Sequence, residues 1–171
     1  MMEIRQAVPN DYPAIYQLVK GAFKTAQVSD GTEQDFVTTL RKKETFIPEL
    51  EFVAVKEGKI IGHVMLSEQE IKTKENRNTF LLLAPLCVDF NYRNQGIGGA
   101  LMDAAFEKAV EMAHHAVFLV GNPEYYTRYG FRQINEFGLK NKSAIPDQFI
   151  LGHELVQGVL SDIEGELEIK E

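Results

Sequence analysis

The chain has 171 residues, of which 44% are hydrophobic and 25% are charged, the composition of a soluble globular protein with a core of its own. Its formal net charge of −7 argues against general nucleic-acid binding, which needs a basic surface. The acidic balance would suit a cationic substrate, although solubility alone also explains it. The single cysteine, Cys87, excludes an internal disulfide framework and a cysteine-based metal cluster.

The sequence carries no membrane or export signal. No apolar run approaches the ~20 residues that a membrane span requires, and residues 1–11 lack the apolar core of a signal peptide. A lone cysteine is compatible with a reducing compartment. We therefore expect a cytoplasmic protein with no membrane partner. Without internal repeats or a flexible linker, residues 1–171 are expected to form a single domain.

The first half of the chain predicts a strand, two helices and a hairpin. Residues 3–7 read as a strand, and Pro9, Asn10 and Asp11 supply turn and helix-capping chemistry. Apolar residues at helical spacing then predict one helix over residues 15–23 and a second over residues 33–43. From residue 51 the period becomes that of strands. Residues 52–55 and 60–66 flank a turn at residues 57–59, which predicts a β-hairpin.

The second half predicts the order strand, helix, strand. A turn at residues 76–78 precedes a long strand over residues 79–89. The helix after it has a buried face made of Ile97, Leu101, Ala104, Ala105, Ala109 and Met112. Residues 116–120 predict a buried strand, and residues 124–129 a short helix that Gly130 ends as its C-cap. Residues 148–155 and 166–170 are candidates for further strands, so the whole is a mixed α/β domain.

The most informative segment is the loop between the strand over residues 79–89 and the next helix. The loop carries Arg93, Asn94, Gln95, Gly96, Ile97 and Gly98. The first turn of a helix has N–H groups without intrahelical partners, and the helix dipole favours negative charge at that end. Glycines also let the backbone approach a ligand closely. A strand, a glycine-bearing loop and a helix start in this order predict a site for a phosphate-bearing ligand.

Three phosphate-binding patterns can be compared with this loop. A Walker loop requires a Gly-x-x-x-x-Gly-Lys-Ser/Thr string, which does not occur. A dinucleotide fingerprint that uses Gly96 and Gly98 requires glycine at Leu101, and no acidic residue closes the strand that ends at Val120. The pattern Arg/Gln-x-x-Gly-x-Gly/Ala remains, and the loop matches it. The alternative is a plain strand–helix turn whose glycines serve packing.

Three segments resemble the GCN5-related N-acetyltransferase (GNAT) superfamily, which binds acetyl-coenzyme A (acetyl-CoA). Residues 85–89, Pro-Leu-Cys-Val-Asp, resemble the strand before the family's phosphate loop, and residues 92–101 resemble its signature loop and helix. Tyr126, Gly130 and Phe131 resemble the family's later Tyr-x-x-x-Gly-Phe element. The motif-bearing core spans residues 50–135, and the combination is similar to a bacterial subgroup of predicted acetyltransferases.

The resemblance implies the GNAT fold, in which a central, mostly antiparallel sheet splays between two parallel strands. The pantetheine arm of acetyl-CoA would lie in that gap, gripped by backbone groups of Leu86, Cys87 and Val88. The Val88 N–H would also polarise the thioester carbonyl. The side chain of Asn122 would contact the pantetheine or an ordered water. The pyrophosphate would lie on the loop residues Arg93, Asn94, Gln95, Gly96, Ile97, Gly98 and Gly99.

Tyr126 is the candidate general acid. The resemblance puts it where family members place a tyrosine hydroxyl next to the coenzyme sulfur. A phenol with a pKa of about 10 is protonated at neutral pH and can give its proton to a departing thiolate. The alternative is that Tyr126 only packs on a short helix, which is what we expect of Tyr125 and Tyr129.

The general base is less well defined. Family members often use a glutamate on a central strand, which makes Glu68 and Glu70 candidates, with a solvated carboxylate as the alternative for each. His63 has apolar neighbours on its face of the strand, so we expect a hydrogen-bonded core histidine there.

The side chains of Cys87 and of the adjacent His114 and His115 are expected to play no chemical role. Cys87 lies inside an apolar strand, which predicts a buried thiol rather than a nucleophile. The adjacent His114 and His115 do not share a helical face, so no metal site is expected.

These residues predict an N-acetyltransferase that moves an acetyl group from acetyl-CoA to a primary amine by direct attack. The acceptor is a small-molecule or peptide amine that the sequence does not identify, and residues 136–171 carry no motif. Two alternatives stay open: a non-catalytic GNAT-like module that senses coenzyme A, and a nucleotide-binding domain. Many family members dimerise, so a homodimer is an open alternative to a monomer.

Overall fold

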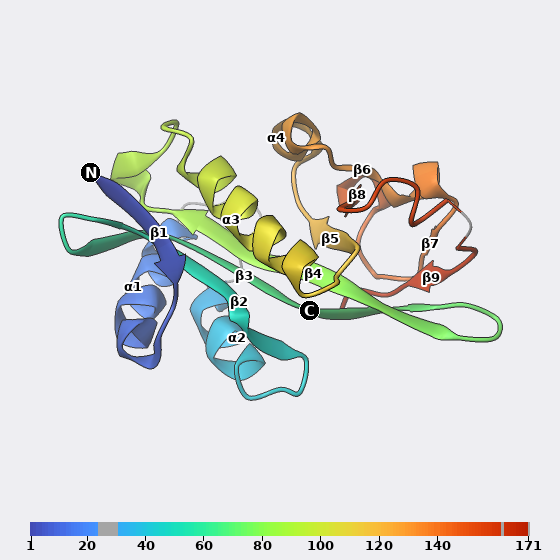
Figure 1. Ribbon diagram of the computed structural model, residues 1–171, viewed down its shortest axis with the longest axis horizontal. Coiled ribbons are helices and arrows are strands. Elements are labelled where there is room, and N and C mark those ends of the chain that lie inside the picture. The colour runs from blue at the N-terminus through green and yellow to red at the C-terminus, as the bar shows by residue number, and fades with distance from the viewer. Residues whose placement is uncertain (24–30, 162, 171) are drawn as a thin grey trace. The chain divides into compact units, whose positions relative to one another are not determined.

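The computed structural model describes residues 1–23, 31–161 and 163–170 (Figure 1). The chain divides into two compact units. The N-terminal unit comprises Met1–Ser67 and Ala84–Lys108, and the C-terminal unit comprises Glu68–Leu83 and Ala109–Glu171. Two long strands, β3 (Lys59–Lys72) and β4 (Arg77–Val88), contribute residues to both units. The single domain over residues 1–171 stays a prediction.

The N-terminal unit contains the first strands and the three longest helices. Its elements are β1 (Met2–Gln6), η1 (Pro9–Asp11), α1 (Tyr12–Ala22), α2 (Glu33–Leu40), β2 (Phe46–Lys56), parts of β3 and β4, η2 (Phe90–Tyr92) and most of α3 (Ile97–Glu111). β1 pairs antiparallel with β2, and β2 pairs antiparallel with β3, which confirms the predicted hairpin. α2 ends three residues before its predicted end because residues 41–44 are charged and cannot extend the buried stripe.

The strands of the N-terminal unit bury both faces. α1 and α2 lie on one side of them and α3 lies on the other (Figure 1). The α1–α2 side forms a core of Ile15, Leu18, Val19, Ala22, Val37, Leu40, Val53, Met65 and Cys87. On the α3 side, a Cβ at Gly62 would come within 2.9 Å of Leu101 Cδ1 and 3.2 Å of Ile97 Cγ2. The first turns of α3 therefore pack directly on the backbone of β3.

Two turns define the ends of β3. Glu57 and Gly58 connect it to β2 with φ values of 52° and 77°, both left-handed, as a two-residue hairpin turn requires. At the other end the prediction is wrong: the turn lies at residues 73–76 and β4 begins at Arg77. The Thr73 hydroxyl accepts a hydrogen bond from Asn76 N at 2.9 Å. This bond forms the turn earlier in the chain than the predicted position at residues 76–78.

The C-terminal unit contains the remaining strands. Its elements are parts of β3 and β4, β5 (Ala116–Val120), α4 (Pro123–Tyr126), η3 (Thr127–Tyr129), β6 (Arg132–Gln133), η4 (Ile134–Phe137), β7 (Lys140–Asn141), η5 (Asp147–Phe149), β8 (Ile150–Glu154) and β9 (Glu166–Leu167). β5 has the predicted bounds. Only the first two residues of the predicted strand over residues 166–170 form β9, which pairs with β3 and β7.

A parallel pair of strands makes the sheet mixed. β4 and β5 run parallel, with Leu81 opposite Val117 and Leu82 opposite Phe118. β8 pairs antiparallel with both β5 and β6. The predicted mixed α/β fold class is therefore confirmed. Within the part of the chain described, no helix is long and apolar enough to cross a membrane.

Candidate functional site

The loop between β4 and α3 has a backbone shaped by two left-handed residues. Asp89 starts it by capping η2, with its Oδ1 accepting from Asn91 N at 2.9 Å. Asn94 and Gly96 then have φ values of 63° and 78°. Apart from its chain neighbours, no heavy atom of the described residues lies within 4 Å of the position that a Cβ on Gly96 would take, so this face of the loop is open among them.

The N-terminus of α3 follows the loop directly. The first hydrogen bond across it runs from Ala100 N to Gly96 O at 3.0 Å. The N–H groups of Ile97, Gly98 and Gly99 come before this bond and have no acceptor further back in the helix. A helix of fifteen residues presents the positive end of its dipole at the same place. The backbone beside the open face of Gly96 therefore suits a phosphate-bearing ligand.

Arg93 braces the loop from the side. Its NH2 group donates to Ala22 O, the last residue of α1, at 2.9 Å, and its Nε donates to Val88 O at 3.3 Å. The guanidinium carbon lies 5.4 Å from the ring centroid of Phe90. These contacts give Arg93 a structural role that the sequence did not reveal. The phosphate contact of this exposed side chain stays a prediction.

The end of β4 leads into the loop. The Asp89 N–H donates to Ile61 O of β3 at 2.8 Å, which fixes the register at this point. Cys87 is buried and free, and burial raises the pKa of its thiol to about 12, with a smaller opposing effect of Arg93. A thiol in this state is protonated and a poor nucleophile, as predicted. The backbone contacts proposed for Leu86, Cys87 and Val88 stay predictions.

In the C-terminal unit, α4 and η3 form the predicted short helix. It begins one residue early, at Pro123, because Asn122 caps it by accepting a hydrogen bond from Glu124 N at 2.9 Å. Gly130 ends it with a left-handed φ of 89°, as predicted. The cap uses the side-chain oxygen of Asn122, and the coenzyme contact expected of this residue stays a prediction.

Among the described residues, the half-buried ring of Tyr126 has close neighbours that include Tyr125, Phe131 and Gly121. It stands edge-on to Tyr125 with centroids 4.9 Å apart and to Phe131 at 5.7 Å. A third side is the backbone of Gly121. Burial, together with a hydrogen bond to Tyr129, raises the pKa of Tyr125 to about 12. Tyr125 and Tyr129 therefore hold each other, which agrees with the packing role predicted for them.

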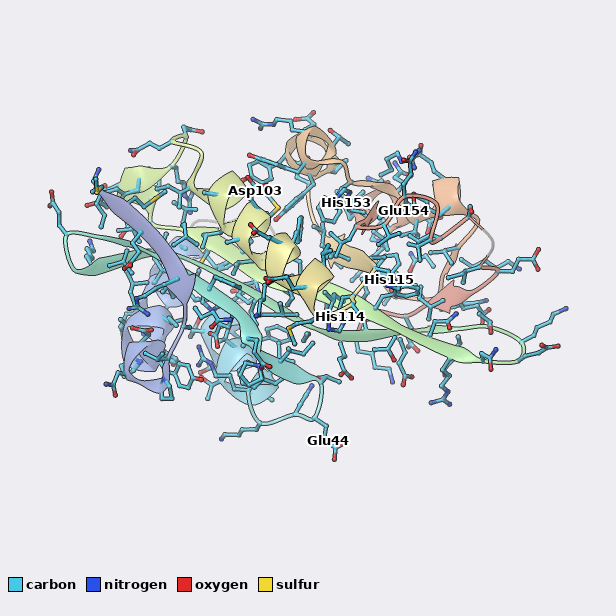
Figure 2. The ribbon with its side chains drawn as sticks, in the orientation of Figure 1. Glu44, Asp103, His114, His115, His153 and Glu154 are labelled. Atoms are coloured by element: carbon cyan, nitrogen blue, oxygen red, sulfur yellow. The ribbon has the colours of Figure 1, made fainter. Side chains whose placement is uncertain are left out.

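A histidine that the sequence did not suggest lies behind Phe131. His153 projects from β8 (Figure 2), and its ring centroid lies 5.3 Å from that of Phe131. Its Nδ1 is 3.1 Å from Gly130 O. No spacing in the sequence links residues 130 and 153, because their contact depends on the strand pairing of the unit.

The two glutamates considered as bases are both exposed. Glu70 forms an ion pair with Arg77 at 3.5 Å. Glu68 interacts electrostatically with His114: burial lowers the pKa of that histidine and Glu68 opposes the shift. The role of Glu68 or Glu70 as a base stays a prediction. Among the side chains that the structure describes, no group of three His, Cys, Asp or Glu could hold a metal ion.

A buried polar network in the N-terminal unit joins β2, β3 and the end of α2. His63 Nε2 lies 2.7 Å from Glu51 Oε2, which confirms the predicted hydrogen-bonded core histidine. Arg41 donates to the same carboxylate and stacks on Tyr12, with 3.7 Å from its guanidinium carbon to the ring centroid.

The protonation states of this network follow from burial. Burial lowers the pKa of His63, against the opposing effect of Glu51, so the ring is neutral and donates its Nε2 proton. Burial alone would raise the pKa of Glu51, but the hydrogen bonds from His63 and Arg41 hold it below its usual range. The signal in the sequence was an acid, Glu51, next to the apolar residues Leu50 and Phe52 of β2.

Comparisons with known proteins identify relatives along the chain. The family model described as an acetyltransferase (GNAT) domain matches residues 3–134. The uncharacterized N-acetyltransferase YhbS of Escherichia coli K12 is 29% identical over 171 residues, which cover 99% of this chain and 97% of YhbS. The uncharacterized N-acetyltransferase YjhQ of the same strain is 34% identical over 99 residues, and these cover 58% of this chain and 55% of YjhQ.

Solved structures of GNAT proteins are similar to the whole fold. The structure of E. coli YhbS in complex with CoA has a TM-score of 0.85 at 27% identity and covers 99% of this chain and 90% of its own. A GNAT acetyltransferase from Brucella melitensis in complex with acetyl-CoA has a TM-score of 0.70 at 27% identity, over 77% of this chain and 83% of its own. The chain belongs to the GNAT family of acetyltransferases.

Proposed function

We propose that this protein transfers an acetyl group from acetyl-CoA to a primary amine by direct attack. The observation that carries the proposal is the loop before α3, with its open Gly96 face and its helix N-terminus, in a chain of the GNAT family. The similar structures of YhbS with CoA and of the Brucella protein with acetyl-CoA support acetyl-CoA as the donor.

In this proposal the chain binds the donor mainly through backbone groups. The N–H groups from Arg93 to Gly99 receive the pyrophosphate, since left-handed residues such as Asn94 and Gly96 are typical of backbone loops that bind anions. The strand residues from Leu86 to Val88 grip the pantetheine arm as an added strand would. The Val88 N–H polarises the thioester carbonyl and stabilises the negative charge that develops on its oxygen.

Acetyl transfer from a thioester needs orientation, a neutral amine and a proton for the leaving thiolate. The nitrogen lone pair attacks the thioester carbon, the C–S bond breaks, and the amine loses one proton. Tyr126 gives its hydroxyl proton to the thiolate. Glu68 or Glu70 accepts the amine proton, directly or through water.

The acid role predicts the behaviour of Tyr126→Phe. This variant keeps the ring packed between Tyr125 and Phe131 but removes the proton donor. We expect kcat at saturating acetyl-CoA to fall about 100-fold, the lower end of what a positioned acid contributes. Tyr129→Phe is the matched control, because its hydroxyl pairs with Tyr125 and it has no role in the proposed mechanism, so its kcat should stay within about twofold of wild type. An unchanged kcat in Tyr126→Phe would remove the acid role.

A non-catalytic coenzyme module is the second candidate, supported by the same loop. A turnover assay distinguishes the acetyltransferase from this module. It asks whether bound acetyl-CoA turns over with any amine of a panel of polyamines, aminoglycosides, lysine and peptides with free N-termini. A nucleotide-binding domain would instead show a melting temperature raised by ATP or a dinucleotide and not by coenzyme A. The loop proposal requires coenzyme A to raise it.

A further inference from the structure

We infer that Gly121 is a positioning residue that sets the place of the Tyr126 hydroxyl. The ring of Tyr126 lies so close to the Cα of Gly121 that position 121 has no room for a side chain. A Cβ on Gly121 would stand 2.5 Å from Tyr126 Cε2 and 3.0 Å from its Cδ2. Real Cβ atoms essentially never make contacts under 3.0 Å. This inference rests on the proposed role of Tyr126 as the acid.

Backbone hydrogen bonds hold the main chain of both partners of this contact. Gly121 is held by its N–H, which donates to Phe149 O at 2.9 Å. Tyr126 is held by its backbone at both ends, since its N–H donates to Asn122 O at 3.2 Å and its carbonyl accepts from Phe131 N at 3.3 Å. A side chain at position 121 would therefore displace the tyrosine ring rather than the backbone.

Two aromatic side chains also contact the ring. Tyr125 and Phe131 meet it edge-on, and Phe131 is itself backed by His153. A ring displaced from Gly121 would be pushed toward these aromatic neighbours, and its hydroxyl would move with it. A misplacement of about 1 Å can cost on the order of 100-fold in rate, because proton transfer needs the donor within hydrogen-bond reach.

A double-mutant cycle of Gly121→Ala and Tyr126→Phe tests the inference kinetically. Both variants and their combination would be assayed by coenzyme A release, at saturating acetyl-CoA and with the fastest amine of the panel. We expect Gly121→Ala to lower kcat about tenfold with a smaller change in the KM for acetyl-CoA. In the Tyr126→Phe background the same change should leave kcat within about twofold, because no hydroxyl remains to be displaced.

A second cycle tests the geometry without any activity. Gly121→Ala should lower the melting temperature clearly, and most of this loss should disappear in the Tyr126→Ala background, where the ring is gone. If Gly121→Ala alone cannot be purified, recovery of folded protein in the double variant gives the same answer. Gly165→Ala is the matched control: its Cβ would meet Ile71 Cγ2 just as closely, but it has no contact with Tyr126. It should lower the melting temperature and keep kcat.

The outcomes separate this inference from the function on which it rests. A lower kcat in Tyr126→Phe with an unchanged kcat in Gly121→Ala overturns the inference and keeps the acid. An equal loss from Gly121→Ala in both backgrounds also overturns it, since Gly121 would then act without the hydroxyl. A melting temperature that Tyr126→Ala fails to restore contradicts the geometry. An unchanged kcat in Tyr126→Phe alone overturns the acid role and the inference together.

Discussion

At the scale of single residues, the side chains near the loop divide into those that build it and those available to a ligand. Arg93 donates two hydrogen bonds, to the backbone carbonyls of Ala22 and Val88. The Asp89 carboxylate caps η2 and lies 3.5 Å from the Lys59 ammonium. The backbone of the loop is thus held in place by its own side chains, so the ligand does not have to order it.

Arg93→Ala should weaken acetyl-CoA binding more than catalysis. The variant loses the bonds to two carbonyls and one positive charge beside the loop. We expect the KM for acetyl-CoA to rise about tenfold, the worth of one hydrogen bond to a charged group, with kcat little changed. Arg77→Ala is the control, because that arginine pairs with exposed Glu70 and is not part of the loop. Equal effects of the two variants would contradict a specific role for Arg93.

The Cys87 thiol should be inert in the folded protein. It is buried and its pKa is raised to about 12, so almost no thiolate exists at neutral pH. A thiol reagent such as Ellman's should titrate one thiol only after unfolding in denaturant. Mass spectrometry after mixing with acetyl-CoA should show no acetyl group on the protein. Rapid acetylation of Cys87 would replace direct attack by a covalent intermediate.

At the scale of elements, the sequence predicted which segments form helices and strands better than where these elements begin and end. The β2–β3 hairpin, the glycine turn at residue 58 and the cap at Gly130 depend on local signals, and the structure confirms all three. The end of α2 and the start of β4 were wrong by three and two residues. These ends depend on where the buried stripe stops and on a Thr73 hydrogen bond, and propensity alone predicts neither.

Two glycine substitutions should have opposite effects on stability. One is at Gly62 of β3, on which α3 packs, and the other is at Gly21 of α1. Gly62→Ala would bring a Cβ within 2.9 Å of Leu101 Cδ1, so it should cost about 1–3 kcal/mol of unfolding free energy. Gly21 lies in α1, where a Cβ would meet no described heavy atom within 4 Å outside its chain neighbours and its own helix backbone, and Gly21→Ala should gain up to about 1 kcal/mol from helix propensity. Denaturant unfolding measures both. A neutral Gly62→Ala would mean that α3 is not seated on β3 as described.

At the scale of the whole molecule, the sequence indicated the family through residues close together in the chain. The contacts that it could not predict join distant segments. Glu51 meets His63 across two strands, His153 meets Gly130, and Gly121 meets the ring of Tyr126 around a helix cap. Each depends on strand register or on the path of a turn. A single sequence carries no periodic signal for such contacts.

The buried network predicts a loss of stability in mild acid. Burial lowers the pKa of His63 in the folded protein, whereas the unfolded chain takes up this proton as the pH falls through about 6.5. The unfolded state then binds more protons, so the free energy of unfolding falls as the pH decreases, by at most about 1.4 kcal/mol per pH unit for one group. Glu51, whose folded pKa is also lowered, adds a further loss below its usual range near 4.5.

Denaturant unfolding between pH 7.5 and pH 5 measures this slope, a range set by the usual histidine pKa of about 6.5. His63→Gln removes the titrating ring and keeps a hydrogen-bond donor toward Glu51, so its slope should be much smaller than that of the native protein. His114→Gln is the comparison for the half-buried histidine after α3. A slope that survives in His63→Gln would assign the pH dependence to other groups.

The measurement that tests the central claim most directly is the release of free coenzyme A from acetyl-CoA, with and without the amine panel. The account predicts steady, amine-dependent release with at least one acceptor and formation of the acetylated amine in equal amount. Tight binding of coenzyme A without release across the whole panel would contradict an acetyltransferase and favour the sensing module.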